Sequence, residues 1–398
     1  MIRKKNSLKD WVTLTKICFI LGSHWDYQMG GSEYQVKLLI DYLKRSRKFQ
    51  IFYVYSGKKE RVFEKNGVIT WVLHRRKWLS KLGKSFFLDS GKLSKILKRI
   101  NPDVIYQRVG SAYTGITAFY SQKYNCPSIW HISLKEELTP WKFRFKPGFL
   151  FGLMDKKILE YGVKHMSHII GQAGYQDRLL RKNYQRKCDL IVPNFHPIPE
   201  GKIRKKGFPV KVVWMANFKE FKRPELFVRL AGEFEDRKDV EFVMIGRPYG
   251  RKRLQTEMER KINAQKNLKY RGEVKFEEAN RILEESHILV NTSLYEGFPN
   301  TFIQAWMRKV PVVSLSVDPD KVVEKNKIGF HSKTFSNLEK DLDKLIINKE
   351  LREKMGERAR KYAFENHSIE KNAEKMVTLL KNTWKEDGIF FTDRRKGR

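Results

Sequence analysis

The sequence is poor in cysteine and contains no long apolar run. Its 398 residues include three cysteines, Cys18, Cys126 and Cys188, which lie far apart and form no CxxC or Cys/His spacing. The missing pairs argue against a zinc site, and the odd count argues against a disulfide framework and fits a reducing cytosol. Nowhere do 18 apolar residues follow one another, so no membrane-spanning helix is expected.

Several nucleotide and targeting signatures are also missing. There is no GxGxxG and no P-loop, so neither NAD binding nor Walker-type ATP chemistry is supported. Lys16 interrupts the first apolar stretch, and residues 17–21 are too short for the apolar region of a signal peptide. The start is therefore interpreted as a basic arm followed by a buried strand.

Acidic residues are scarce relative to basic ones. Lys and Arg number 81 against 45 Asp and Glu, which gives a net charge of +36. Residues 1–200 hold 37 basic and 15 acidic residues, and the remainder holds 44 and 30. Such a field attracts polyanions: nucleic acid, anionic lipid headgroups or phosphorylated substrates.

Strand-like runs alternate with helical patterns in both halves of the chain. Strands are predicted at 16–21, 49–55, 68–73, 104–107, 128–131, 211–215, 240–245, 268–271, 288–291 and 310–315. Helices are predicted at 34–44, 88–100, 115–123, 225–234, 276–285, 301–308 and 369–384. This order indicates an α/β protein with two Rossmann-like, doubly wound parallel sheets. We expect domains at 1–196 and 209–365, a Pro-, Gly- and charge-rich linker at 197–208, and a helical segment at 366–398.

The segment 291–313, NTSLYEGFPNTFIQAWMRKVPVV, carries the strongest chemical signal. A strand is predicted to end near Asn291, a loop to follow, and a helix to begin at Asn300 or Thr301, either of which can cap it after Pro299. Backbone N–H groups at such a helix start suit a diphosphate. Glu296 in the loop can accept hydrogen bonds from sugar hydroxyls, and Gln304, expected in the first helical turn, is positioned for ribose hydroxyls.

This segment resembles the donor-site motif of retaining glycosyltransferases of family 4, which have the GT-B fold of two Rossmann-like domains facing across a cleft. The family pattern has a Glu, commonly Gly-Phe-Pro, and a second Glu eight positions after the first, followed by Ala. The chain supplies Glu296, then Gly297, Phe298 and Pro299, and later Ala305. It departs at Gln304, which brings no charge. A structural alternative is that Thr301 and Gln304 form a T-x-x-Q capping box.

Residues 212–231, VVWMANFKEFKRPELFVRLA, are similar to the strand, basic loop and helix that start the family's second domain. The resemblance implies that Lys222 binds the donor diphosphate, with Asn217 where many members carry Arg and Lys219 near enough to share the role. A lysine there would offset the charge on the leaving group. The alternative is a solvated basic loop.

In the first half, Gly30 and Gly31 follow a strand and precede a helix, similar to the family's glycine-rich loop that approaches the donor phosphate and transferred sugar. The preceding Asp26 and Tyr27 are candidates for acceptor contacts. His131 ends a strand where family members often place an active-site histidine, so it is a candidate catalytic residue beside Glu296 and Lys222. Arg108 is a candidate for binding an anionic acceptor. Tight turns and buried structural residues are the alternatives.

The resemblance implies transfer of a hexosyl group from a nucleotide diphospho-sugar with retention of configuration, to a lipid-linked or polysaccharide acceptor. It implies no cofactor and no metal, so the D-x-D at 318–320 is interpreted as a loop, and it implies that the C-terminal helical segment packs back on the first domain. The expected location is cytoplasmic, peripheral on the inner membrane face. A non-catalytic nucleotide-sugar-binding protein and a basic nucleic-acid-binding protein remain as alternatives; no recognition signature favours the latter.

Two stretches, 75–87 and 141–151, mix basic with bulky apolar residues in the acceptor-side half. Basic residues gain about 1 kcal/mol each near an anionic membrane surface, and aromatic residues prefer the interfacial layer. We therefore predict that the purified protein floats with anionic liposomes at low salt. Absence of binding under those conditions would contradict a membrane-surface role.

Overall fold

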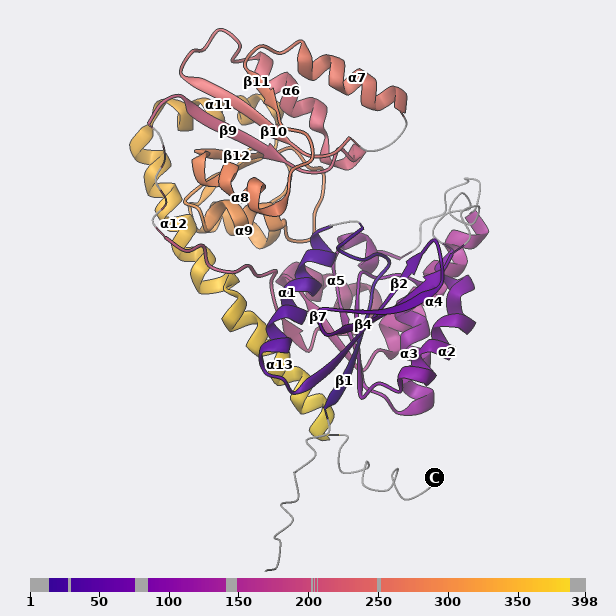
Figure 1. Ribbon diagram of the computed structural model, residues 1–398. Helices are drawn as coiled ribbons and strands as arrows, with labels where there is room; N and C mark the ends of the chain where they lie inside the picture. The colour runs from indigo at the N-terminus through magenta and orange to yellow at the C-terminus, as the bar shows by residue number, and fades with distance from the viewer. Residues whose placement is uncertain are drawn as a thin grey trace, which may run out of the picture. The chain divides into compact units, whose positions relative to one another are not determined.

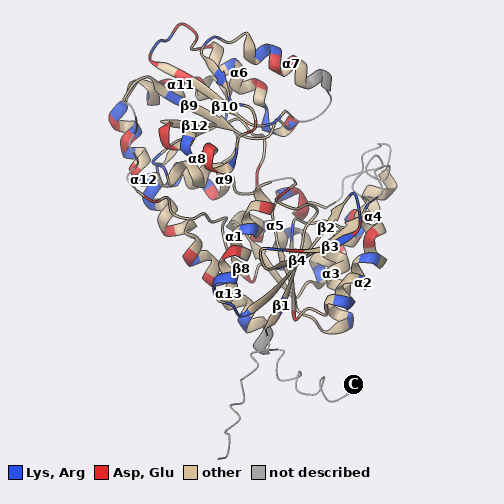
Figure 2. Cartoon of the chain, viewed as in Figure 1, with Lys and Arg blue, Asp and Glu red and all other residues tan. Residues whose placement is uncertain are grey.

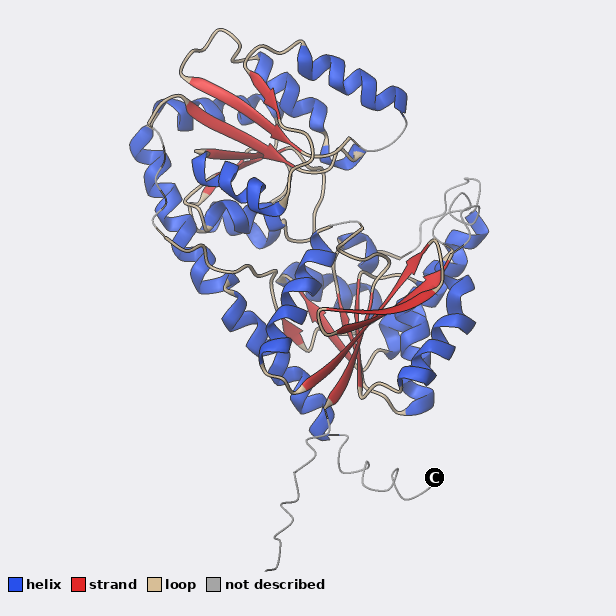
Figure 3. Cartoon of the chain, in the orientation of Figure 1, coloured by secondary structure: helices blue, strands red, loops and turns tan. Residues whose placement is uncertain are grey.

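A computed structural model describes residues 14–27, 30–75, 85–140, 149–201, 203, 205, 207–248 and 252–386 of the chain. The described residues alternate between strands and helices and form two sheets (Figures 1 and 3). The chain divides into two compact units. The first contains the chain up to Gly171, Leu179–Leu190 and the chain from Lys375, and the second contains Gln172–Arg178 and Ile191–Glu374.

The first unit is built on a sheet in the order β3-β4-β2-β1-β5-β6-β7-β8. Its strands are β1 (Thr15–Ile20), β2 (Phe49–Gly57), β3 (Arg61–Lys65), β4 (Val68–His74), β5 (Val104–Arg108), β6 (Ser128–His131), β7 (His168–Gly171) and β8 (Leu190–Ile191). The central strand β1 is apolar on both faces: Cys18 and Ile20 join one core, and Ile17 and Phe19 are also fully buried. Such continuous burial is typical of a parallel strand covered by helices on both sides.

The helices of the first unit are α1 (Gly31–Arg45), α2 (Ser90–Ile100), α3 (Ala112–Tyr124) and α4 (Phe149–His165), together with part of α5 (Gly174–Tyr184) and part of α13 (Ile369–Glu386). Helices α3 and α4 approach closely through two glycines. A Cβ atom added at Gly115 would lie 2.0 Å from the carbonyl oxygen of Ile158, and one added at Gly162 would lie 2.6 Å from the backbone of Thr114. Only residues without a side chain fit this crossing.

The second unit contains a sheet in the order β11-β10-β9-β12-β13-β14, with every paired neighbour parallel. Its strands are β9 (Val210–Met215), β10 (Val240–Ile245), β11 (Leu268–Tyr270), β12 (Ile288–Asn291), β13 (Val312–Ser314) and β14 (Gly329–His331). Its helices are α6 (Pro224–Gly232), α7 (Lys252–Asn263), α8 (Phe276–Glu285), α9 (Asn300–Trp306), α10 (Val322–Lys325), α11 (Phe335–Ile347) and α12 (Lys349–His367).

Two cores cover the two faces of this second sheet. Along β9, Val212 and Trp214 enter one core, whereas Val213 enters the other, as the two-residue period of a strand requires. Trp214 and Trp306 are among the largest fully buried side chains. Burial of a large apolar side chain contributes roughly 2–3 kcal/mol, so these cores fix the strands that position the loops at their ends.

The prediction of an α/β fold with two doubly wound parallel sheets is confirmed, apart from one edge. Strand β3 pairs antiparallel with β4, and its charged sequence RVFEK gave no strand pattern. Helix α9 starts at Asn300 and ends at Trp306, earlier than the predicted 301–308. The predicted helix at 88–100 begins as a 3₁₀ turn over Phe86–Asp89 and continues as α2.

Basic residues occur on helices of both units (Figure 2). Most of the two basic and apolar stretches proposed for the membrane surface, residues 76–84 and 141–148, lies outside the described residues. Among the helices that are described, none is both long and apolar enough to cross a membrane.

Candidate functional site

The second unit brings two loops together at the carboxyl ends of neighbouring strands. Because β9 and β12 pair in parallel, the basic loop after β9 (residues 216–223) and the Glu296 loop after β12 (residues 292–299) leave the same edge of the sheet. The backbone amide of Leu294 donates to the carbonyl of Phe221 at 2.7 Å. The rings of Phe221 and Tyr295 stack with centroids 5.0 Å apart. Open α/β sheets bind ligands at this edge.

An ion pair between Lys222 and Glu296 joins the two loops. Lys222 Nζ lies 2.5 Å from Glu296 Oε1, and both side chains are mostly buried, with exposed fractions of 18% and 13%. Ser293 Oγ donates to the same oxygen at 2.8 Å, and Asn291 Nδ2 lies 3.4 Å from it. All three of these contacts are made to Oε1. The structure thus brings together two of the three predicted catalytic residues.

Arg223, which was not predicted from the sequence, joins the basic loop to the start of the Glu296 loop. Its Nε donates to the carbonyl of Thr292 at 2.6 Å, and its Nη2 reaches Ser316 Oγ at 2.7 Å and the Ser293 carbonyl at 3.3 Å. Its backbone has φ of 50°, in the left-handed region. The following Pro224 disfavours the ordinary helical conformation at Arg223, but nothing in the local sequence indicates these side-chain contacts.

The other predicted residues of the basic loop, Asn217 and Lys219, lie in the turn after β9. Lys219 Nζ and Lys222 Nζ lie 6.0 and 5.3 Å from the centre of the Phe221 ring. The carbonyl of Asn217 accepts from the amide of Lys219 at 2.7 Å, which turns the chain after β9. The basic loop thus carries two ammonium groups near the Phe221 ring, a density of positive charge that suits a phosphorylated ligand.

The start of α9 differs from the sequence prediction. Pro299 occupies the N-cap position, and neither Asn300 nor Thr301 caps the helix with its side chain. Because the helix starts one residue earlier than Thr301, the Asn300 side chain lies inside the first turn, and its Oδ1 lies 3.2 Å from His196 Nε2. The amides of this first turn follow directly on Gly297 and Phe298, which are buried in the loop.

Gln304 is the fifth residue of α9, beyond the first turn in which it was expected. Its side chain is 5% exposed, and Nε2 donates to Asn280 Oδ1 of α8 at 3.0 Å. The T-x-x-Q capping box with Thr301 does not form, because the helix start leaves no free N-cap side chain there. Gln304 thus joins α9 to α8.

In the first unit, His131 ends β6 next to two hydrogen-bonding partners. Tyr106 Oη lies 2.7 Å and Arg108 Nη1 lies 3.2 Å from His131 Nδ1. A guanidinium can only donate, so Nδ1 accepts, and the proton of the neutral imidazole is on Nε2. This tautomer makes His131 a hydrogen-bond donor at Nε2. Arg108 is 2% exposed, and its guanidinium helps to orient the histidine.

The glycine-rich loop of the first unit leads into α1. Gly30 is the N-cap residue and Gly31 the first residue of the helix. Ser32 Oγ donates to Ser133 Oγ at 3.2 Å, which links the first turn of α1 to the segment after His131. The two predicted acceptor residues lie before it: Asp26 pairs with Lys65 Nζ at 2.7 Å, and Tyr27, 60% exposed, contacts Arg61.

Two buried histidines lie beside the Glu296 loop. Burial lowers the pKa of His196 to about 3 and that of His367 to about 4. The bond to Asn300 favours the charged form of His196, while the charges of His367 and Arg308 oppose it. Both imidazoles are therefore neutral at physiological pH. His367 Nδ1 donates to the carbonyl of Asn194 at 2.7 Å.

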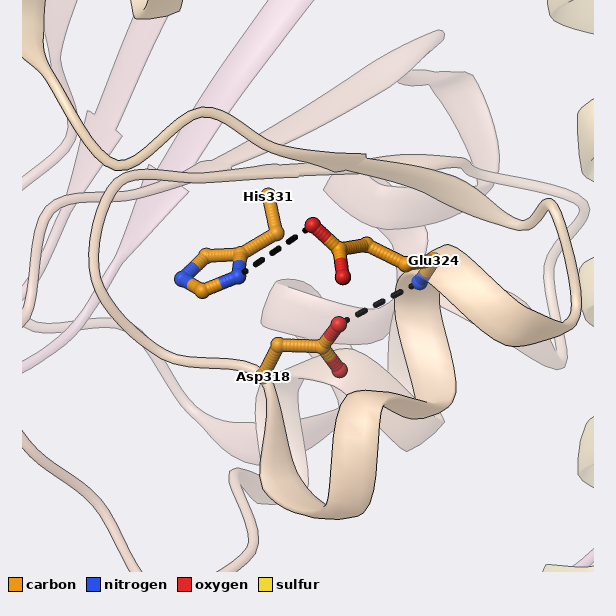
Figure 4. A group of neighbouring side chains, drawn as sticks. All are labelled: Asp318, Glu324 and His331. Atoms are coloured by element: carbon orange, nitrogen blue, oxygen red, sulfur yellow. Dashed lines mark hydrogen bonds and ion pairs between the residues drawn. The ribbon is translucent and has the colours of Figure 1, made fainter.

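Asp318, Glu324 and His331 form a group whose side chains approach one another closely (Figure 4). The carboxylate of Asp318 accepts from the amides of Val323 at 2.8 Å and Glu324 at 3.2 Å, which caps α10. Glu324 pairs with Lys333 Nζ at 3.0 Å and lies 3.6 Å from His331 Nδ1. Capping and ion pairing account for the positions of these side chains, so the group is not assigned as a metal centre. Asp320 of the same D-x-D accepts from the amide of Gly174 at 2.6 Å.

Comparison with known proteins shows which family and which proteins this chain resembles. Residues 199–362, which include both loops, match the Glycosyl transferases group 1 family. A poly(ribitol-phosphate) alpha-N-acetylglucosaminyltransferase of Staphylococcus aureus (strain COL) is 30% identical over 104 residues, which are 25% of this chain and 21% of that protein. The chain thus matches about a fifth of the length of this curated relative.

Solved structures extend the likeness to nearly the whole chain. Sucrose-phosphate synthase from Thermosynechococcus elongatus superposes with a TM-score of 0.71 at 13% identity, over 94% of this chain and 100% of that one. The Anabaena protein Alr3699/HepE, in complex with UDP and glucose, gives 0.67 at 13% identity over 92% and 100%. The fold is GT-B. At such low identity the GT-B likeness establishes the fold, while the group 1 match is confined to the segment with Lys222 and Glu296.

The two buried histidines predict a loss of stability in acid. An unfolded histidine has a pKa near 6.5, and both folded values are lower, so the stability these neutral groups contribute is complete above pH 6.5 and is lost as the pH falls. At pH 5 each histidine should lower the unfolding free energy by about 2 kcal/mol relative to pH 8. Urea unfolding at pH 8, 6 and 5 measures this effect.

The variant His196→Gln separates this contribution from that of other groups, since glutamine stays neutral throughout. The difference in unfolding free energy between the native chain and the variant should shift by about 2 kcal/mol between pH 8 and pH 5. A difference that does not change with pH would contradict the neutral assignment of His196.

Proposed function

We propose that the chain is a glycosyltransferase that moves a hexosyl group from a nucleotide diphospho-sugar to a polysaccharide or lipid-linked acceptor, with retention of configuration. The observation that carries this proposal is the Lys222–Glu296 ion pair at the carboxyl ends of β9 and β12, inside the segment that matches the group 1 family. The GT-B fold supports it.

The two charges have complementary tasks in such a reaction. Breaking the glycosidic bond leaves negative charge on the diphosphate, and the ammonium groups of Lys222 and Lys219 would stabilise that charge. Glu296 would accept hydrogen bonds from hydroxyls of the transferred sugar through Oε2. Without a donor, each member of the pair neutralises the charge of the other, which keeps both side chains in place although they are mostly buried.

The remaining residues are assigned by position. The segment from Gly297 to Thr301 would border the diphosphate, with the amides of Asn300 and Thr301 at the start of α9 donating to it and Pro299, which has no N–H, setting the helix start, and Gln304 would face the ribose. In the first unit, Gly30 and Gly31 would approach the transferred sugar, and His131 would donate from Nε2 to a sugar oxygen. Arg108 would act through His131 or on an anionic acceptor, and Asp26 and Tyr27 would contact the acceptor. No metal is assigned, because the lysines can supply the positive charge.

The comparisons suggest which substrates to test first. The Anabaena structure contains UDP and glucose, and the S. aureus relative is named for N-acetylglucosamine transfer to poly(ribitol phosphate). UDP-glucose and UDP-N-acetylglucosamine are therefore the first donors, and a polyol-phosphate polymer, which fits the net charge of +36, is the first acceptor. An anionic membrane surface as a partner stays a prediction from the sequence.

Removing either charge of the pair should abolish most turnover. We expect Glu296→Gln and Lys222→Met each to lower kcat/KM for donor hydrolysis or transfer by about 100-fold or more, because each removes a charged group aimed at the reacting centre. Donor turnover with UDP-glucose and UDP-N-acetylglucosamine measures this.

Lys211→Met is the matched control, because Lys211 pairs with Glu285 at 2.7 Å at the opposite end of β9. It should leave turnover within about twofold, since exposed pairs contribute little. Donor binding without turnover in the native chain would favour the non-catalytic alternative. Salt-sensitive DNA binding without donor binding would favour the nucleic-acid alternative.

The Gln304 assignment makes a separate prediction. Gln304→Glu should preserve or tighten UDP binding, because a carboxylate accepts from ribose hydroxyls and the Asn280 amide can turn its NH₂ group toward it. Gln304→Met, which cannot hydrogen-bond in this way, should weaken UDP binding about fivefold, the equivalent of one neutral hydrogen bond. Calorimetric titration with UDP measures both. Equal affinities for the native chain and the Met variant would reduce Gln304 to a link between α9 and α8.

A further inference from the structure

The Glu296 loop is held by segments that lie far from it in the sequence. Residues 172–178 belong to the second unit by their contacts, as does the chain from Ile191 onward, although the residues before 172 and those at 179–190 belong to the first. Tyr175 of α5 donates from Oη to the carbonyls of Gly297 at 3.3 Å and Glu296 at 3.4 Å. Backbone carbonyls of the Glu296 loop thus accept hydrogen bonds from a chain segment that leads from one unit to the other.

The segment 191–196 makes the closest of these contacts. Asn194 Nδ2 donates to the carbonyl of Phe298 at 2.8 Å, and Asn194 is 4% exposed. His196 Nε2 donates to Asn300 Oδ1 at 3.2 Å. Asn194 and His196 thereby fix the backbone just after Glu296 and the first residue of α9.

Asn194 and His196 are themselves held by contacts with the junction of α12 and α13. The backbone amide of His196 donates to the carbonyl of His367 at 2.9 Å, and the amide of Ile369 donates to the carbonyl of His196 at 3.1 Å. The ring of His367 also packs against Phe298, with centroids 4.8 Å apart. The junction of α12 and α13, the segment 191–196 and the Glu296 loop therefore form one continuous hydrogen-bonded stack.

Buried polar contacts of this kind define a conformation, because a buried carbonyl that loses its partner is costly. The Glu296 loop is irregular, so its carbonyls have no ladder of their own, and the Asn194 amide satisfies that of Phe298. If this contact is lost, the loop must rearrange to satisfy the group elsewhere. The rearrangement would move the residues between Glu296 and Asn300.

We propose that Asn194 and His196 are positioning residues that set the conformation of the Glu296 loop for the donor, and that they link this loop to the segments connecting the two units. The part that concerns the donor rests on the proposed glycosyltransferase function. Neither residue needs to touch the donor, since both act through Phe298 and Asn300.

The test uses variants of the full chain that remove single hydrogen bonds. Asn194→Asp keeps the shape but lacks the NH₂ donor, and His196→Phe lacks the Nε2 donor. His196→Gln places an NH₂ group near the position of Nε2 and serves as the rescue variant. Tyr175→Phe is a milder change that removes only a hydroxyl, and it remains informative if Asn194→Asp fails to fold. Asn267→Asp is the matched control, because Asn267 Nδ2 donates to the Ala231 carbonyl at 2.8 Å in the same unit.

Two readouts separate positioning from general stability. Hydrogen exchange of the peptide covering residues 292–300 reports on the loop without any ligand, and calorimetric titration with UDP reports on donor affinity. We expect Asn194→Asp and His196→Phe to speed exchange of this peptide and to weaken UDP binding, each about tenfold. His196→Gln should stay within about threefold of the native chain, Tyr175→Phe should show a smaller change of the same sign, and Asn267→Asp should show none in either readout.

The outcomes distinguish failure of this inference from failure of the proposed function. If the native chain binds UDP but Asn194→Asp, His196→Phe and Tyr175→Phe leave exchange and affinity unchanged, the positioning role is wrong. If Asn267→Asp produces the same changes as Asn194→Asp, the effect is general destabilisation, and the inference is again wrong. If the native chain binds no nucleotide, the donor part fails together with the proposed function, and the exchange data alone decide whether these residues hold the loop.

Discussion

The parallel pairing of β9 with β12 is the contact on which the candidate site depends. These strands are separated by more than 70 residues in the sequence, yet they pair directly, with Val212 opposite Ile288 and Val213 opposite Leu289. Their apolar side chains enter cores on both faces of the sheet, so the register is fixed by burial. The loops that follow inherit this register, and Lys222 and Glu296 meet because of it.

In the candidate site, Lys222 and Glu296 neutralise each other, and hydrogen bonds from neighbouring residues hold them in place. A lysine and a glutamate that are mostly withdrawn from water are costly as isolated charges, and each makes the other tolerable. Arg223 holds the backbone of Thr292, and Ser293 donates to the Glu296 carboxylate. Both contacts restrict the geometries that the ion pair can adopt. A phosphorylated ligand that enters such a site meets groups whose orientation is already set, so less ordering is needed when it binds.

Much of the fold and the centre of the site were predictable from the sequence. Apolar runs such as 240–245 and 288–291 coincide with β10 and β12, because a buried parallel strand is apolar over most of its length. The motif around Glu296 indicated a loop followed by a helix, since Gly297 favours an irregular backbone and Pro299 a helix start, although α9 begins one residue earlier than predicted. Strand β3 escaped prediction because it is an edge strand whose charged side chains face solvent.

Contacts that depend on tertiary structure could not be predicted in this way. Nothing local to Asn300 indicates that its side chain lies against His196 rather than capping its own helix, because the two residues are 104 positions apart. The same holds for Gln304, whose partner Asn280 lies in another helix. Arg223 was overlooked because an arginine in a basic loop has the same local pattern whether it binds solvent or backbone carbonyls.

The second unit is made of segments that are not contiguous in the sequence, which affects how chimeras between relatives should be joined. The residues that match the group 1 family begin at position 199, but Tyr175 and Asn194, which hold the loop, come earlier in the chain. A chimera joined at the proline-rich linker would carry the loop of one parent and the supporting residues of the other. Junctions placed before Gln172 and after Ser368 would keep loop and support from the same parent, so the cassette that can be exchanged between relatives is longer than the sequence match.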